Sequence, residues 1–125
     1  MAWDDARQFC EKKGAHLVDI DSLAEQKIVT DIVDVAGIRA SFWIAVNDLE
    51  SENDFRASEG SKQEFFDWYF GEPNDASGED CVEVYTKSWK WNDQSCTDEN
   101  PFVCEKGKIS TALHLYWINF FRVFR

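Results

Sequence analysis

Two segments in the first third of the chain repeat apolar residues with the period of an α-helix. The segment 3–13 places apolar side chains on one face, carries two aspartates in its first turn and is followed by a glycine. The segment 22–37 opens with an S-x-x-E capping box formed by Ser22 and Glu25, and it stops at a glycine. Both segments are therefore predicted to form amphipathic helices.

Beyond residue 37 the pattern changes to short apolar runs separated by polar sequence. Four runs are predicted to be strands, namely 42–46, 65–70, 81–85 and 102–106. Residues alternate within the third run, so Val82 and Val84 are expected on one face and Glu83 and Tyr85 on the other. The intervening sequence includes long irregular stretches at 47–64 and 71–80. Loops of that length usually need a covalent restraint or serve a function.

The length and charge of the chain limit what it binds. A chain of 125 residues is expected to form one domain, and a net charge of −11 makes nucleic acid a poor partner. Residues 1–106 hold all 24 acidic residues, whereas 107–125 form a hydrophobic, aromatic tail with three basic residues and no acid. The tail is too short and too often interrupted by polar residues to predict a membrane span.

Four cysteines stand at positions 10, 81, 96 and 104, without a CxxC pair. A zinc site usually draws two ligands from one tight turn, so two disulfides are the favoured interpretation. Disulfides indicate a secreted or extracellular protein. No signal peptide is visible at the start of the chain, so the natural N-terminus is expected to be missing.

Carboxylates and carboxamides gather on both sides of the second cysteine, Cys81. The loop 72–81 reads EPNDASGEDC, and a WND motif follows at 91–93. An acidic loop of this kind is often only a solvated surface. A set of hard oxygen ligands without a nearby histidine or free thiol nevertheless favours calcium, which takes six to eight such ligands.

The motifs WIAV, EPN, GEDC, WND and PFVCEK occur in this order together with all four cysteines. In this respect residues 1–106 resemble the C-type lectin-like domain family. The resemblance implies an α+β fold in which two helices flank small antiparallel sheets and a long loop region binds calcium. It also implies the disulfides Cys10–Cys104 and Cys81–Cys96. Domains of this family usually begin with a strand that pairs with the last strand, and here that first strand is missing. An open sheet edge is therefore expected near 102–106, which the tail either covers or leaves prone to aggregation.

The resemblance also assigns the ligands of two calcium ions. The principal ion, which would bind the carbohydrate as well, would take Glu72, Asn74, Glu79, Asn92 and Asp93. An auxiliary ion would take Asp48, Glu52, Asp75, Glu79 and Asp80. Pro73 would follow a cis peptide bond, which only proline allows at small cost.

In this family EPN is associated with mannose-type sugars, so the sequence predicts a calcium-dependent lectin for mannose, fucose or N-acetylglucosamine rather than galactose. One such sugar binds weakly, so homo-oligomerisation or tandem domains would be needed for avidity. The alternative is a lectin-like domain whose ligand is a protein, ice or lipid. A glycosidase is disfavoured because the resemblance assigns every candidate carboxylate to calcium. His16 and His114 are isolated in the sequence and are not predicted to be ligands.

Overall fold

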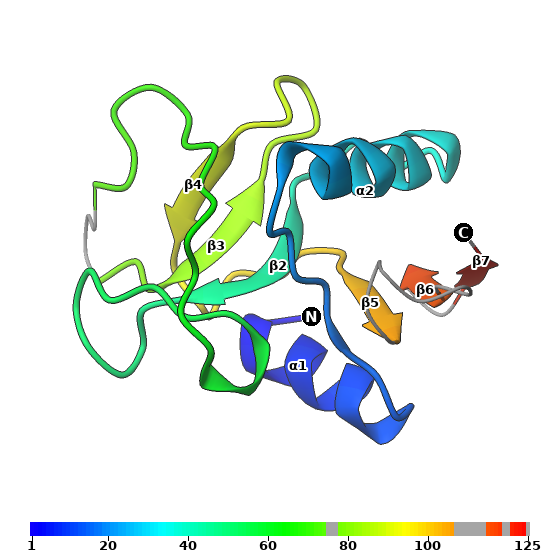
Figure 1. The fold of residues 1–125 in the computed structure, drawn as a ribbon, viewed down its shortest axis with the longest axis horizontal. Helices are drawn as coiled ribbons and strands as arrows, with labels where there is room; N and C mark the ends of the chain where they lie inside the picture. Colours follow the sequence, from blue (N-terminus) through cyan, green and yellow to red (C-terminus); the bar gives the residue numbers. More distant parts are fainter. Residues whose placement is uncertain (75–77, 107–114, 119–120, 125) are drawn as a thin grey trace.

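The computed structural model describes residues 1–74, 78–106, 115–118 and 121–124, which fold into helices and two small sheets (Figure 1). Helix α1 spans Trp3–Lys12 and helix α2 spans Leu23–Val35, so both predicted helices are confirmed. The N-terminus of α2 is capped as expected, because the Ser22 hydroxyl accepts a hydrogen bond from the Glu25 N–H at 3.1 Å.

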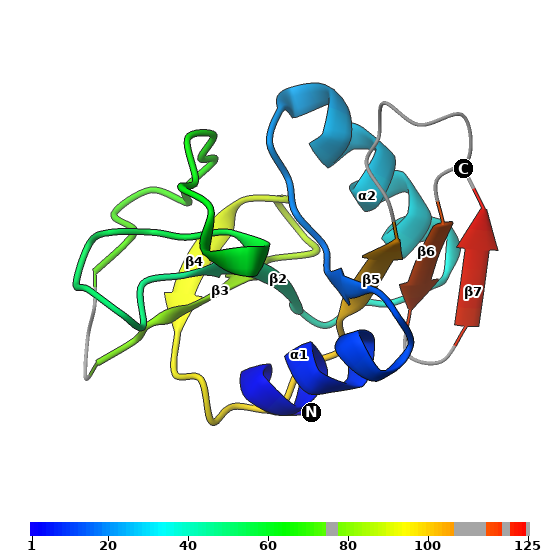
Figure 2. The ribbon, with the colours of Figure 1, turned by 60° about the horizontal axis from the view of Figure 1, so that its bottom comes forward.

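The first sheet is antiparallel and has the strand order β2-β3-β4. Its strands are β2 (Phe42–Asn47), β3 (Cys81–Val84) and β4 (Trp91–Gln94). The second sheet has the order β1-β5-β6-β7. Its strands are β1 (His16–Leu17), β5 (Val103–Lys106), β6 (Leu115–Ile118) and β7 (Phe121–Phe124). The two sheets lie side by side, with α2 and α1 on opposite sides of the second sheet's β1–β5 pair (Figure 2).

One prediction about strands is wrong. The aromatic segment 65–70 is not a strand, since only Trp68 forms an isolated bridge, to Trp91. The segment is joined to the sheet at a single residue, because the edges of Phe65 and Trp68 pack against Trp91 and the backbone of Trp91 hydrogen-bonds Asp67 and Tyr69. Strand β3 is buried on both faces, because all four of its residues are buried. The tail covers the edge of β5, which is one of the two outcomes expected, because β6 pairs with it from Val103↔Ile118 to Lys106↔Leu115.

Both implied disulfides are present. Cys10–Cys104 joins α1 to β5, and Cys81–Cys96 joins the start of β3 to the segment that follows β4. The second bridge holds together the two ends of a hairpin whose strands carry acidic residues. In the entropic description, closing a loop of this length stabilises the fold by about 3 kcal/mol.

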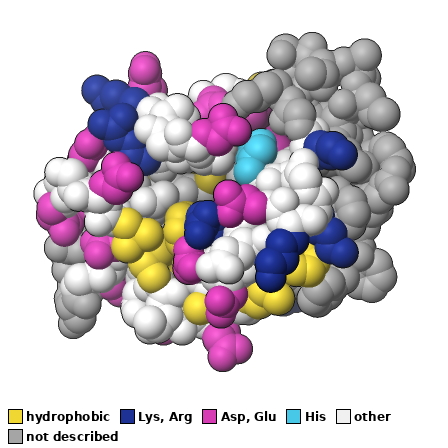
Figure 3. Space-filling model, turned by 90° about the horizontal axis from the view of Figure 1, so that it is seen from below, with side chains coloured by type: hydrophobic (Ala, Val, Ile, Leu, Met, Phe, Trp, Pro, Cys, Tyr) yellow, Lys and Arg dark blue, Asp and Glu magenta, His cyan; other side chains and the backbone are white. Residues whose placement is uncertain are grey.

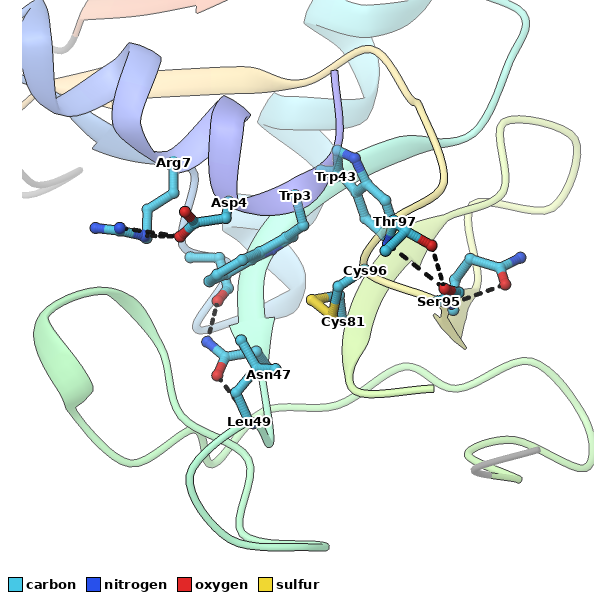
Figure 4. The surroundings of a disulfide bond; sticks show 12 residues. Trp3, Asp4, Arg7, Trp43, Asn47, Leu49, Cys81, Ser95, Cys96 and Thr97 are labelled. Atoms are coloured by element: carbon cyan, nitrogen blue, oxygen red, sulfur yellow. Dashed lines mark hydrogen bonds and ion pairs between the residues drawn. A yellow bond between two sulfur atoms is a disulfide. The ribbon is translucent and has the colours of Figure 1, made fainter. Parts of the chain in front are cut away.

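The hydrophobic core consists of two clusters that meet at β2. One cluster lies between α2 and the three-stranded sheet, and the other lies between α1 and the two disulfides. The indole N–H of Trp3 donates to the carbonyl of Ile44, and that of Trp43 donates to the carbonyl of Met1, both at 2.9 Å. Their rings lie beside the Cys81–Cys96 bridge (Figure 4). The core therefore anchors the start of β3, from which the candidate site is built.

Candidate functional site

The EPN motif lies in the loop that precedes β3, and its backbone is fixed on both sides. The Glu72–Pro73 peptide bond is cis, as predicted. The Glu72 N–H donates to the carbonyl of Tyr69 at 2.9 Å. The Asn74 N–H donates to Asp93 Oδ1 at 3.1 Å, and its amide Nδ2 donates to Glu72 Oε2 at 3.3 Å. Glu72, Asn74 and Asp93, which are 21 positions apart in the sequence at most, therefore meet at one point.

The WND motif occupies β4, where the sequence analysis does not predict a strand. Asn92 lies opposite Glu83 in the β3–β4 register and Asp93 lies opposite Val82. The Asn92 amide Nδ2 donates to Glu83 Oε2 at 3.0 Å, in a buried contact. Glu83 Oε1 accepts a second hydrogen bond from Asn100 at 2.9 Å. Because its amide N–H is bound to Glu83, the Asn92 side-chain oxygen is oriented as the acceptor available for a cation.

Sequence reasoning missed the role of Glu83. The available signal was a carboxylate in the middle of the apolar run CVEVY, which the alternation pattern placed on the face opposite Val82 and Val84. Glu83 is only 5% exposed and orients a candidate ligand. A carboxylate buried in a strand needs hydrogen-bond partners, and the two asparagines supply them.

The electrostatics of the EPN loop fit a bound cation. Burial, together with the carboxylates of Asp93 and Glu79, raises the pKa of Glu72 to about 7. Glu72 Oε1 is buried and accepts no hydrogen bond from the described residues. No lysine or arginine in the described part of the chain forms an ion pair with Glu72. A divalent cation would satisfy the unpartnered oxygen and remove the repulsion between the acids.

The auxiliary set is brought together in part. Oxygen atoms of Asp48, Glu52 and Asp80 lie within 4.8 Å of one another. The Asp48 N–H donates to the Asp80 carbonyl at 3.0 Å, and Asp48 Oδ2 accepts from the Asn53 N–H at 2.9 Å. Asp48 Oδ1 is buried and has no hydrogen-bond partner among the described residues, so this set also fits a cation. Asp75, which is predicted to be a further ligand, lies outside the described residues.

The acidic loops differ from the ordinary solvated surface of the molecule. On the face that carries α1, acidic and basic side chains are interspersed (Figure 3). Arg7, for example, pairs with both Asp4 and Glu11 on that helix. Neither Glu72 nor Asp48 forms such a pair with a described residue. The negative charge of the candidate sites is therefore not neutralised by ion pairs of the kind seen on α1.

His16 is isolated in the sequence, but the fold places it beside two acidic residues. The β1–β5 register places His16 opposite Glu105, and its Nδ1 lies 3.6 Å from Asp19 and 3.9 Å from Glu105. Burial raises the pKa of Glu105 to about 8. Asp19 binds Ser58 through both the N–H and the hydroxyl of that residue. This cluster therefore ties the second sheet to the long loop 48–64. His114 lies outside the described residues.

Comparison with known proteins identifies the family. The family described as "Lectin C-type domain" matches residues 1–106. The chain belongs to the C-type lectin domain family. It is 36% identical over 105 residues to human "C-type lectin domain family 17, member A", a match that covers 84% of this chain and 27% of that protein. It is 34% identical over 112 residues to human "C-type mannose receptor 2", covering 87% of this chain and 7% of that protein. The chain thus spans about a quarter or less of these relatives.

Solved structures of C-type lectin domains have the same fold. The carbohydrate-recognition domain of the mouse scavenger receptor C-type lectin superposes with a TM-score of 0.77 at 34% identity, covering 86% of this chain and 83% of that one. The cow CD23 domain, determined in the presence of a GlcNAc2Man3 oligosaccharide, gives a TM-score of 0.77 at 34% identity, covering 86% and 81%. A Ca²⁺-dependent type II antifreeze protein gives 0.77 at 26% identity, covering 86% and 85%. The predicted α+β C-type lectin fold is therefore confirmed.

Two further properties follow at the level of the family. The C-type lectin fold is a non-enzymatic carbohydrate-binding scaffold. Its domains are typically extracellular and disulfide-bonded, and this domain contains two disulfides. No helix among the described residues has the length and apolar character needed to cross a bilayer.

Proposed function

We propose that this domain is a calcium-dependent lectin that prefers mannose-type sugars, namely mannose, fucose or N-acetylglucosamine. The observation that carries the proposal is the meeting of Glu72 and Asn74 from the EPN loop with Asp93 from β4, around a buried carboxylate oxygen that lacks a partner. The principal ligand set would comprise Glu72, Asn74, Glu79, Asn92 and Asp93. The auxiliary set would comprise Asp48, Glu52, Asp75, Glu79 and Asp80.

The cation would supply open coordination positions for two neighbouring hydroxyls of a sugar, while the protein residues hydrogen-bond the same hydroxyls. Each hydroxyl both donates and accepts, so a carboxylate and a carboxamide are needed beside it. Glu72 with Asn74 supplies one such pair, and Glu79 with Asn92 supplies the other. Glu83 would keep Asn92 in the orientation that this arrangement needs, because it holds the Asn92 amide at 3.0 Å.

The preference for mannose-type sugars rests on the order of acceptor and donor in EPN. Exchanging them in the double variant Glu72→Gln, Asn74→Asp is expected to shift binding from mannose toward galactose. The total of carboxylates and carboxamides is unchanged, so calcium binding is expected to persist. Competition of immobilised mannan binding by free mannose and free galactose measures the shift. A variant that binds calcium but retains the mannose preference would contradict the argument.

A glycan array in the presence of Ca²⁺ and again with excess chelator tests the proposed function itself. We expect signals on mannose-type glycans that disappear with chelator and return when Ca²⁺ is restored. Binding to one glycan contributes only about −4 kcal/mol for a millimolar complex, so the domain should be presented as a multimer on the detection reagent. The absence of any calcium-dependent sugar signal from the correctly oxidised protein would refute the proposal.

A lectin-like domain with a non-sugar ligand is the second candidate. The observation that favours it is the presence of type II antifreeze proteins among the structural neighbours, one of them calcium-dependent and one calcium-independent. Ligand binding that survives chelator, together with an empty glycan array, would support this alternative.

We assign no catalytic function. Extracellular location and self-association for avidity belong to the same proposal.

A further inference from the structure

Strand β7 ends the second sheet and has one side without a partner strand. The sheet order is β1-β5-β6-β7, and among the described residues β7 pairs only with β6. Both ribbon views place β7 at the periphery of the molecule (Figure 1, Figure 2). An edge strand presents a row of unpaired N–H and C=O groups, which can bond a strand of another chain.

The other edge strands of the described structure are less available than β7. Strand β1 is only two residues long. The outer side of β2 is met by bridges from Arg56 and Phe102, and the outer side of β4 is met by a bridge from Trp68. The Tyr69 N–H also donates to the carbonyl of Trp91 in β4 at 2.8 Å. Among the described strands, β7 is therefore the four-residue edge whose outer side has no bridge.

The β6–β7 register shows which backbone groups of β7 are directed to the open side. Ile118 and Phe121 are partners and are separated by two residues in the sequence, so they can only be a hydrogen-bonded pair. Hydrogen-bonded and non-hydrogen-bonded pairs alternate along an antiparallel ladder. Phe121 and Val123 therefore bond to β6, whereas the N–H and C=O groups of Arg122 and Phe124 are directed outward.

The outward edge of β7 is complementary to itself about Val123. When two β7 strands pair antiparallel with a two-fold axis at Val123, Arg122 of each copy lies opposite Phe124 of the other. The outward groups of these residues then meet in hydrogen-bonded pairs. A register centred on Arg122 would place like charges directly opposite each other, which is unfavourable, and one centred on Phe124 would pair fewer residues of β7. The sequence of β7 therefore favours the register about Val123.

We propose that β7 is a homodimer interface, in which the β7 strands of two copies pair antiparallel about Val123 and join their second sheets into one. The same strand is used by both copies, so the pairing covers both open sides at once and closes the assembly at two. Strand β7 lies beyond residues 1–106, which match the lectin family, so the interface is separate from the lectin domain itself. The inference names the interface for the self-association that belongs to the proposed function, but the pairing needs neither sugar nor calcium. A dimer presents two EPN loops, which raises the avidity for clustered glycans.

Sedimentation equilibrium of the full chain, in chelator and without sugar, tests the interface. A short strand pairing makes a small contact, so we expect dimers to be populated by about 1 mM and to dissociate on dilution. The mass should rise from 14.5 kDa toward twice that value. Arg122→Pro removes an outward N–H, which an edge strand tolerates, and should stay at the monomer mass. The matched control Arg122→Ala removes the same charge but keeps the N–H, so it should dimerise like the wild type.

Cross-linking tests the register and does not depend on the folding of the proline variant. Val123→Cys places one thiol of each copy at the two-fold axis, where the Cα atoms of a non-hydrogen-bonded pair lie about 4.5 Å apart. Mild oxidation should therefore link the dimer through this position. Phe121→Cys lies two positions from the axis, so its two thiols would be about 13 Å apart along the strands and should not link.

Three results would overturn the interface. The first is a wild-type protein that remains monomeric at about 1 mM, where even a weak pairing should be populated. The second is dimerisation of Arg122→Pro that equals that of Arg122→Ala, or cross-linking of Phe121→Cys as fast as that of Val123→Cys. The third is growth beyond the dimer, which a closed two-fold pairing does not allow. The glycan array measures sugar binding separately, so each of these results would leave the lectin function standing.

Discussion

Replacing Glu72 with glutamine is expected to stabilise the protein in the absence of calcium and to reduce the stabilisation that calcium gives. Glu72 lies beside Asp93 in a partly buried loop, and its pKa is raised from 4.5 to about 7. A carboxylate whose folded-state pKa is raised costs the fold stability progressively as the pH rises from the unfolded-state pKa to the folded-state pKa, and the full cost is present above the latter. At pH 8, without calcium, the wild-type protein therefore carries a cost that the neutral glutamine avoids.

The size of this cost follows from the change in pKa. A rise from 4.5 to about 7 corresponds to about 3 kcal/mol between the protonated and ionised forms. Solvent at the partly exposed loop screens the charge, so we expect about 1–2 kcal/mol. A chain of this length has an unfolding entropy near 0.26 kcal/mol/K, so Glu72→Gln should raise the melting temperature in chelator by about 4–8 °C. At pH 5, where the wild-type carboxyl is protonated, the difference should largely disappear.

Calcium should close most of this difference. Extracellular calcium sites commonly have dissociation constants of about 10⁻⁴–10⁻³ M, so 5 mM Ca²⁺ should stabilise the wild-type protein by about 1–2 kcal/mol. Glu72→Gln removes a ligand charge and should gain much less. Thermal unfolding followed by circular dichroism, at pH 8 with either chelator or 5 mM Ca²⁺, measures both effects.

The matched control is Glu64→Gln, which removes the same charge from an exposed position outside both calcium sets. It should leave the melting temperature within about 2 °C of wild type in chelator, and it should retain the calcium-induced rise. The reasoning fails if Glu72→Gln melts below the wild type in chelator at pH 8, or if calcium stabilises both proteins equally.

Two further predictions concern acids away from the EPN loop. Asp48→Asn keeps an oxygen for the Asn53 N–H but removes the charge beside the buried Oδ1. Calorimetric titration should therefore find one fewer Ca²⁺ per domain, while mannose binding at the principal site persists. An unchanged stoichiometry would contradict the auxiliary site. Burial raises the pKa of Glu105 from 4.5 to about 8, so its contribution to stability is present below pH 4.5 and is lost as the pH rises toward 8. The free energy of unfolding of Glu105→Gln, measured with urea, should therefore exceed that of the wild type by about 2–4 kcal/mol at pH 8.5 and differ little from it near pH 4.5. A difference that does not depend on pH would refute this prediction.

The parts of the fold that sequence predicted correctly are those in which local and tertiary signals agree. Helix α2 has both a capping box and a periodic apolar face, and it begins within one residue of Ser22. The segment 65–70 has the aromatic content of a strand, but residue type alone cannot distinguish a ladder from a coil held by rings that pack on Trp91. Strand β4 has the opposite problem, because WNDQ contains one apolar residue and its extended form comes from pairing with β3.

In the candidate site, too, the residues within sequence motifs could be predicted, whereas those whose role depends on tertiary structure could not. EPN and WND contain carboxylates and carboxamides, the residue types that a calcium site needs, so these motifs indicate the proposed ligands directly. The supporting residues carry no comparable signal, because their role depends on which strands are neighbours. Glu83 can orient Asn92 only because the β3–β4 register places them opposite each other, and Asn100 reaches the same carboxylate from beyond the Cys81–Cys96 bridge. The acceptor oxygen of Asn92 is thus aimed by a buried pair that only the folded hairpin creates, so the geometry of the site depends on the hairpin as much as on the motifs.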